Sequence, residues 1–562
     1  MIVKLFVKDN RLFFLLFLSY LLALLIIQPW GNYPLNDDWS YAKSVLSIDQ
    51  VGHVDIGEWP AMTLYTHAMW GYLFIKLFGF SFLVLRFSTW VSMCIGVFSF
   101  YRLGEKLTGN KQKAALMSAV LLYNPIYFNL SHTFMTDVNF MTLFILSLSL
   151  VYSFIHQPTL HKVVAILILS ISITLLRQFG LLVPISFLFT TFFIKEKKLL
   201  WVVSAFLIFG ITYYTLYRYE SFLKSYLTPW SSYKFSNDIK PFEPEFWKRY
   251  WFLMTLRYKV VFIYLFFHTF VFAAAFLPAV LKQNKWWIIT TVFFFNYAWV
   301  WYVYDGFPLQ MNNVFLDTAV GTDTSHETLS GTFINRPHFY NAGVAQFLDV
   351  LKTIFIASGL STVILHLWAQ RKKSWDLKRI VFFLYLVVFI ALYLSLVFIA
   401  ESFFDRYFLP IIVLSLITLA HFSKHYDLNW RIVAPLLLFW MYISIGGTHD
   451  YFALNDARWQ LVKTLREKEK VPSEKIHGSF EQVCWNESNN MNLWSFASLK
   501  TFDYVIQFHC EDSFMLYHEK VFQRFWPPQK DTIRLYKRYL FAKKDLTDTL
   551  PSSSPLSNRH ER

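Results

Sequence analysis

Long apolar runs, separated by short polar segments, dominate the chain. A membrane-spanning helix needs about 20 mostly apolar residues, and the pattern predicts thirteen such helices. The predicted spans are residues 12–30, 81–101, 114–131, 138–155, 162–177, 179–194, 199–217, 258–281, 286–304, 346–368, 380–400, 408–422 and 431–447. No small-residue cleavage site follows the first span, which ends in Gln-Pro-Trp, so we expect a retained helix and not a signal peptide.

Lysine and arginine positions predict the orientation of these spans. Basic clusters precede the first span and follow the second, sixth, eighth and tenth. With thirteen spans all of these clusters lie on one face, which is then cytoplasmic. Counting residues 61–79 as another span would place the 102–113 cluster outside, so we expect an interfacial helix there. One long helix over 162–194 would place the basic cluster at Lys195 outside the cell. We therefore expect two short helices there, which place this cluster on the cytoplasmic face. The basic outer segment 218–257 is an exception that a long loop permits.

The composition supports a membrane protein. The chain is 55% hydrophobic and only 16% charged, whereas a soluble domain is about 25% charged. This excludes a soluble enzyme and a disordered protein. The net charge of +15 is assigned to the cytoplasmic loops and not to nucleic-acid binding. No Walker A or Gly-x-Gly-x-x-Gly pattern occurs, so no nucleotide cofactor is expected.

The composition changes after Gly447, where long apolar runs stop. Apolar spacing predicts a helix over 456–469 and strands at 476–480, 504–508 and 532–539. We therefore expect a membrane domain over 1–447, a small extracytoplasmic α/β domain over 448–542 and a disordered tail over 543–562. Acceptor binding, a cover for the active site and a stabilising cap all remain open roles for this domain.

Two cysteines belong to this C-terminal region, Cys484 and Cys510. They are the only cysteines outside the predicted spans. An extracytoplasmic compartment is oxidising and permits a bridge between them. We therefore predict a disulfide between Cys484 and Cys510, against the alternative of two free thiols.

Ionisable residues gather on the outer face, from segments far apart in the sequence. They are Asp37, Asp38, His132, Asp137, Arg177, Arg336, His338, Asp405 and Arg406, with Arg86 inside the second span. Taken singly, each has an ordinary explanation, such as a solvated turn or a surface ion pair. Charged groups at the membrane are costly, so their concentration on one face indicates a functional site.

The motifs resemble a known superfamily. A first helix followed by Asp37-Asp38-Trp-Ser-Tyr-Ala resembles the first-loop acidic motif of GT-C integral-membrane glycosyltransferases. The resemblance is to the family 39-like branch, related to protein mannosyltransferases and the lipid A aminoarabinose transferase. Further similar stretches are 79–89, 134–138, 177–184, 405–410 and 448–459, so the resemblance covers about residues 12–481. Many relatives have Asp-Glu where this chain has Asp37-Asp38, which leaves open which carboxylate reaches the substrate.

The resemblance implies a GT-C-like fold and transfer of a sugar from a polyprenyl-phosphate donor on the extracytoplasmic face of the cell membrane. The acceptor is a lipid, glycan or protein. Such a reaction needs a carboxylate base and cations for the leaving phosphate. The candidate catalytic residues are Asp37, Asp38 and Asp137, and the candidate phosphate-binding residues are Arg86, Arg177, Arg336 and Arg406. His132, His338 and Asp405 are candidates for acceptor or metal contact, and dependence on a divalent metal ion is left open.

Two other functions compete with this hypothesis. A transporter or flippase of lipid-linked saccharides would place charges near the bilayer midplane, commonly in two related repeats. The sequence shows no repeat, and its charges collect at one face. A polysaccharide polymerase or ligase is the other alternative, and the first-loop Asp pair argues against it.

Overall fold

The computed structural model describes most of the chain. The described residues are 10–57, 59–194, 197–226, 243–283, 285–304, 315–316, 319–320, 342–370, 376–399, 404–486, 502–508, 514–525 and 528–538. Arg336, His338 and Cys510 lie outside these residues. The predicted boundary between the C-terminal domain and the tail, at residues 542 and 543, also lies outside them.

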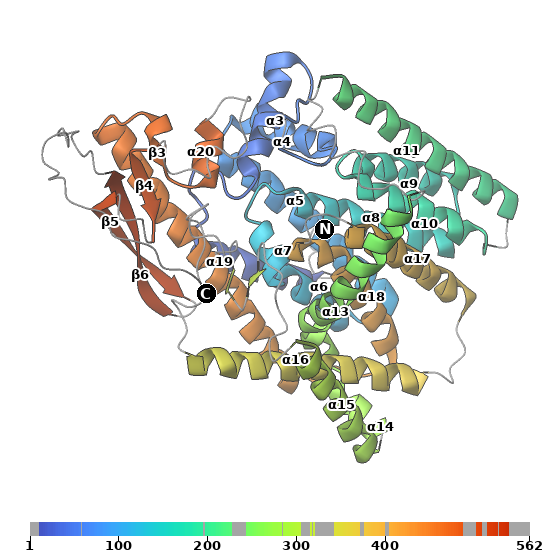
Figure 1. Cartoon of the computed structure of the whole chain (residues 1–562). Coiled ribbons are helices and arrows are strands. Elements are labelled where there is room, and N and C mark those ends of the chain that lie inside the picture. Colours follow the sequence, from blue (N-terminus) through green and yellow to red (C-terminus); the bar gives the residue numbers. More distant parts are fainter. Residues whose placement is uncertain are drawn as a thin grey trace, which may run out of the picture.

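Helices make up the body of the molecule (Figure 1). In chain order they are α2 (Arg11–Ile27), α3 (Asp38–Val51), α4 (Tyr65–Phe78), α5 (Phe82–Thr108), α6 (Lys111–Leu122), α7 (Pro125–Leu130), α8 (Thr136–His156), α9 (Leu160–Thr174), α10 (Leu182–Thr191), α11 (Lys198–Tyr226), α13 (Pro244–Ala274), α14 (Leu277–Gln283), α15 (Trp286–Tyr304), α16 (Ala342–Gln370), α17 (Leu377–Ile399), α18 (Leu409–Phe422), α19 (Trp430–Lys463) and α20 (Phe480–Asn486). Short 3-10 turns precede α10 and α18, at Gln178–Leu181 (η1) and Asp405–Phe408 (η3).

Six helical stretches within the described residues are long and apolar enough to cross a membrane. They are Phe82–Thr108, Thr136–His156, Lys198–Ser225, Leu377–Ile399, Asp405–Phe422 and Trp430–Lys468. Five shorter apolar helices accompany them, including Arg11–Ile27 and Leu160–Thr174. The predicted polytopic α-helical membrane fold is thereby confirmed. The count of thirteen spans and their orientation stay predictions.

Several helix boundaries depart from the expected spans. Residues 114–131 form two helices, because Pro125 cannot continue α6 and instead starts α7. The Asn124 side chain caps α7 by accepting hydrogen bonds from the N–H groups of Ile126 and Tyr127. Across 162–194 the expected two helices are confirmed as α9 and α10. A Cβ at Gly180, in the turn between them, would lie 2.4 Å from the Ile173 carbonyl carbon.

The C-terminal region carries a four-stranded sheet, as expected for an α/β domain. Its strands are β3 (Ile476–His477), β4 (Tyr504–Gln507), β5 (Phe514–Phe525) and β6 (Pro528–Arg538). The order is β3-β4-β6-β5, with β3 parallel to β4 and the other pairs antiparallel. Strand β5 and helix α20 were not expected from the sequence. Two further two-residue strands, Phe315–Leu316 and Ala319–Val320, pair with each other.

One helix joins the membrane body to this sheet. The predicted last span and the predicted helix over 456–469 are a single element, α19, which passes residue 447 without a break. Near its middle the Asp450 carboxylate accepts a hydrogen bond from the Phe525 N–H of β5 at 2.6 Å. Tyr442 donates to the Phe525 carbonyl at 2.8 Å. The sheet therefore rests along α19, while α20 packs against α3 at the start of the chain (Figure 1).

Candidate functional site

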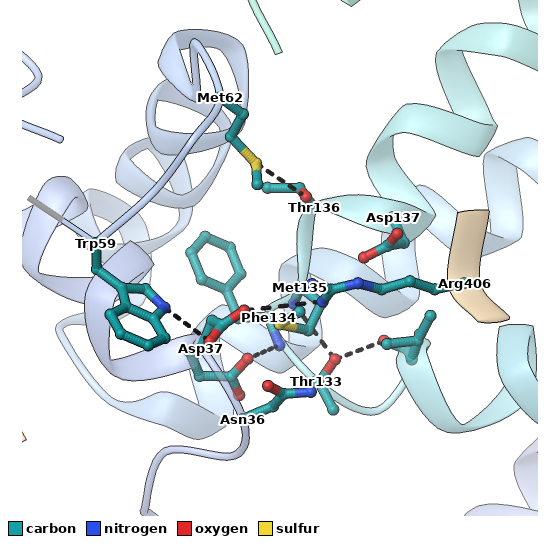
Figure 2. Close-up of polar contacts among 12 residues, drawn as sticks. Asn36, Asp37, Trp59, Met62, Thr133, Phe134, Met135, Thr136, Asp137 and Arg406 are labelled. Carbon is teal, nitrogen blue, oxygen red and sulfur yellow. Dashed lines mark hydrogen bonds and ion pairs between the residues drawn. The ribbon is translucent and has the colours of Figure 1, made fainter. Parts of the chain in front are cut away.

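Asp37 lies at the junction between the first loop and α3. Its Oδ1 accepts a hydrogen bond from the Trp59 indole N–H at 2.9 Å. Its Oδ2 lies 3.8 Å from Nη1 of Arg406. Only 9% of Asp37 is exposed, so the carboxylate is held in a largely buried position and faces a cation (Figure 2).

Arg406 comes from η3, 369 residues further along the chain, and 7% of it is exposed. Its guanidinium lies over the Phe404 ring, 4.9 Å from the centroid. Within the described part of the chain, Nε and Nη1 have no hydrogen-bond partner. Buried N–H groups of this kind are costly unless something accepts from them, so the guanidinium is suited to bind an oxyanion.

Asp137 lies in the first turn of α8, on the other flank of the Arg406 side chain (Figure 2). Its Oδ1 pairs with Nη2 of Arg177 at 2.9 Å. Arg177 also donates through Nε to the Thr136 hydroxyl at 2.9 Å. The second Asp137 oxygen has no hydrogen-bond partner among the described residues. Four segments thus bring two carboxylates and two guanidiniums together.

Asp38 has a different environment from Asp37. It is fully buried, and its Oδ1 accepts from the Phe134 N–H at 2.8 Å. Its Oδ2 accepts from the Leu35 N–H at 3.4 Å. Burial raises the pKa of Asp38 to about 8, although the charge of Arg86 and the two N–H groups act in the opposite direction. Asp38 therefore joins the first loop to the segment before α8, and Asp37 is the carboxylate beside Arg406.

His67 of α4 holds the same segment from the other side. Its Nε2 lies 3.0 Å from the Phe134 carbonyl, and its Nδ1 lies 2.8 Å from Nδ2 of Asn139. The ring also stacks on Phe134. Since a carbonyl only accepts, Nε2 carries the proton and Nδ1 accepts from the amide. Burial lowers the pKa of His67 to about 3, which is consistent with a neutral ring.

The other predicted site residues have structural partners. Arg86 is fully buried and donates to the backbone carbonyls of Pro29, Gly31 and Tyr33, so it holds the loop after α2. His132 is buried among aromatic rings, with Nδ1 2.7 Å from the Phe128 carbonyl. Asp405 accepts from the backbone N–H of Arg406 at 2.7 Å. These contacts leave Asp37, Asp137, Arg177 and Arg406 as the assembled group.

Sequence reasoning missed two residues that contact the first loop. Trp59 donates to Asp37, and Glu481 of α20 accepts from the Asn36 N–H at 3.2 Å. Trp59 is one of 21 tryptophans, and nothing in its neighbourhood marks it. Glu481 lies 445 residues from its partner. No local pattern could have identified either one.

The two carboxylates of the assembled group are each paired with an arginine. No group of three or more His, Cys, Asp or Glu side chains gathers among the described residues in a way that could hold a metal ion. Asp37 and Asp137 each face a guanidinium, which already supplies the positive charge that a metal would bring.

Comparisons with known proteins add little at the sequence level. No protein-family model matches the chain, and no curated protein matches it. Two solved structures of ArnT from Cupriavidus metallidurans are similar over 94% of this chain and 98% of theirs, one bound to undecaprenyl phosphate and one in the apo state. Both show 10% identity and a TM-score of 0.37. At this level of similarity the functional argument depends on the residues of the site itself.

Proposed function

We propose that this membrane protein is a GT-C-type glycosyltransferase that moves a sugar from a polyprenyl phosphate to an acceptor hydroxyl on the extracytoplasmic face. The observation that carries the proposal is the buried Asp37 carboxylate beside Arg406, whose Nε and Nη1 lack hydrogen-bond partners within the described residues. A carboxylate base next to an oxyanion-binding guanidinium is what transfer from a phosphate leaving group requires.

In the proposed reaction Asp37 accepts the proton of the acceptor hydroxyl while that oxygen attacks the anomeric carbon. The bond from this carbon to the phosphate oxygen breaks, and the electron pair leaves with the polyprenyl phosphate. Arg406 donates hydrogen bonds to the phosphate oxygens as negative charge builds on them. Arg177 pairs with Asp137 at 2.9 Å, so the charge of Asp137 is balanced within the cluster while Arg406 binds the phosphate.

Binding of the lipid phosphate tests the role of Arg406 without knowledge of the sugar. We expect undecaprenyl phosphate, added to the detergent-purified protein, to raise the melting temperature of the wild type. Arg406→Gln should weaken this binding about tenfold or more, because a charge-assisted hydrogen bond is lost. Arg431→Gln is the matched control, since Arg431 is exposed at the start of α19. Equal binding by wild type and Arg406→Gln would contradict the assignment.

Mass spectrometry of cells tests the transfer itself. Surface glycans, lipids and glycoproteins from a gene-deletion strain should lack one sugar that the wild-type gene restores. The Asp37→Asn gene should fail to restore that sugar at equal expression. An unchanged glycan and lipid profile in the deletion strain, together with no release of polyprenyl phosphate in vitro from any donor of a sugar panel, would overturn the proposed function.

A further inference from the structure

The residue before Asp37 has an unusual backbone. Asn36 has φ +53°, in the left-handed region. Residues other than glycine rarely adopt this region, although asparagine tolerates it better than most. This conformation sets the direction in which the chain enters α3, and with it the position of Asp37. Some contact must therefore keep Asn36 in place.

That contact comes from the C-terminal region. The Asn36 N–H donates to Oε1 of Glu481 at 3.2 Å. Glu481 is only 3% exposed, and its Oε2 has no hydrogen-bond partner within the described residues. Burial of a carboxylate is unfavourable, so apolar packing alone does not explain a glutamate here. Among the described residues it accepts a hydrogen bond from the first loop, and its charge also acts on the buried guanidinium of Arg458.

Further contacts dock the same helix against the same loop. Lys43 of α3 donates to the Cys484 carbonyl at 2.8 Å. The Phe480 ring lies 5.9 Å from Trp39 and 5.1 Å from Trp59, measured between ring centroids. Trp59 is in turn the donor to Asp37. Helix α20 therefore supports Asp37 from two directions, through its backbone neighbour and through its hydrogen-bond donor.

We propose that Glu481 is a positioning residue for Asp37, and that α20 makes the C-terminal region an integral part of the active site. The expected change in kcat rests on the proposed function. The expected change in the structure of the first loop does not. The carboxylate of Glu481 fixes Asn36, and thereby sets the distance between Asp37 and Arg406. Glu481 itself takes no part in proton transfer.

Two substitutions separate hydrogen bonding from packing. Glu481→Met keeps the length of the side chain and removes the acceptor, whereas Glu481→Gln retains an acceptor oxygen. For Glu481→Met we expect kcat for polyprenyl phosphate release to fall about 10- to 100-fold, since a misplaced catalytic group costs this much. The donor KM should stay within about twofold. Glu481→Gln should retain most of the wild-type kcat, and Glu474→Met, at an exposed position of the same region, should retain all of it.

Hydrogen–deuterium exchange of the purified full chain gives a readout independent of activity. Peptides covering residues 32–42 should exchange faster in Glu481→Met than in wild type or Glu474→Met. Wild-type exchange and kcat in Glu481→Met would overturn the inference and leave the proposed function standing. Faster exchange in Glu481→Met, together with no transferase activity of the wild-type protein, would support the structural contact and refute the proposed function.

Discussion

At the residue scale, the structure separates two neighbouring carboxylates that the sequence could not distinguish. Asp37 faces Arg406 at 3.8 Å, while both oxygens of Asp38 accept backbone N–H groups. The difference arises because α3 begins between them, so that their side chains point to different surroundings. The proposed catalytic base and a residue with structural contacts thus stand side by side in the acidic motif.

We predict that Asp37→Asn abolishes most sugar transfer while the protein stays folded. Loss of a general base lowers the rate about 10²–10⁴-fold, and the amide keeps the size of the side chain. The measurement is the release of polyprenyl phosphate from the donor, with melting temperature and expression compared alongside. Asp49→Asn is the control, since Asp49 belongs to an exposed pair with Lys76 at 2.7 Å. A folded Asp37→Asn protein with wild-type transfer would show the assignment to be wrong.

The raised pKa of Asp38 predicts that the stability of the folded protein depends on pH. Its pKa is raised from the usual 3.8 to about 8 by burial, so folding favours the protonated form. The resulting stabilisation is complete below about pH 4 and is lost as the pH rises through about 8. We expect this contribution to lower the melting temperature of the wild type between about pH 4 and pH 8, with no further loss above pH 8.

Asp38→Asn serves as the comparison, because an amide resembles the protonated acid and does not titrate. Its melting temperature, followed by tryptophan fluorescence, should fall less over the same pH interval. Parallel curves for the two proteins would mean that another group is responsible for the wild-type dependence.

At the element scale, periodicity identified most helices, and the departures have local causes. Pro125 divides one apolar run into α6 and α7. Helix α19 extends past 447 because Gly446 and Gly447 do not interrupt it and both are buried. Apolar and polar residues do not alternate regularly along β5, because most of this strand is exposed. Its buried positions include the charged Arg524, whose Nε lies 3.7 Å from Oδ2 of Asp450. Contacts such as Glu481 with Asn36 link distant positions, so no sequence window contains them.

The predicted Cys484–Cys510 disulfide would link helix α20 to a later segment of the chain, and alkylation can test it. Cys484 is buried in α20, and Cys510 lies outside the described residues. We expect both thiols to resist alkylation in the unfolded protein until a reductant is added. A bridge closing this loop would stabilise the region by about 3 kcal/mol in the chain-entropy model. Modification of both cysteines without reductant would exclude the bridge.

At the scale of the whole molecule, the assembled charge cluster is consistent with the predicted orientation, because its members all come from segments assigned to one face. Thirteen spans place the N-terminus inside and residue 455 outside. Reporter fusions after residues 110, 198 and 375 should give cytoplasmic signals, and a fusion after 455 should give an extracytoplasmic one. A cytoplasmic signal at 455 would refute the thirteen-span topology.

The contact between α20 and the first loop also has a consequence for biosynthesis. A ribosome makes Asn36 and Asp37 early, and Glu481 is the 444th residue after Asp37, so the first loop is synthesised long before its support exists. Domains generally fold as they are synthesised, from the N-terminus onward. Here the last part of the chain completes a structure begun by the first. A prematurely terminated chain that inserts normally would therefore carry every arginine and aspartate of the cluster and still lack the support that orients Asp37.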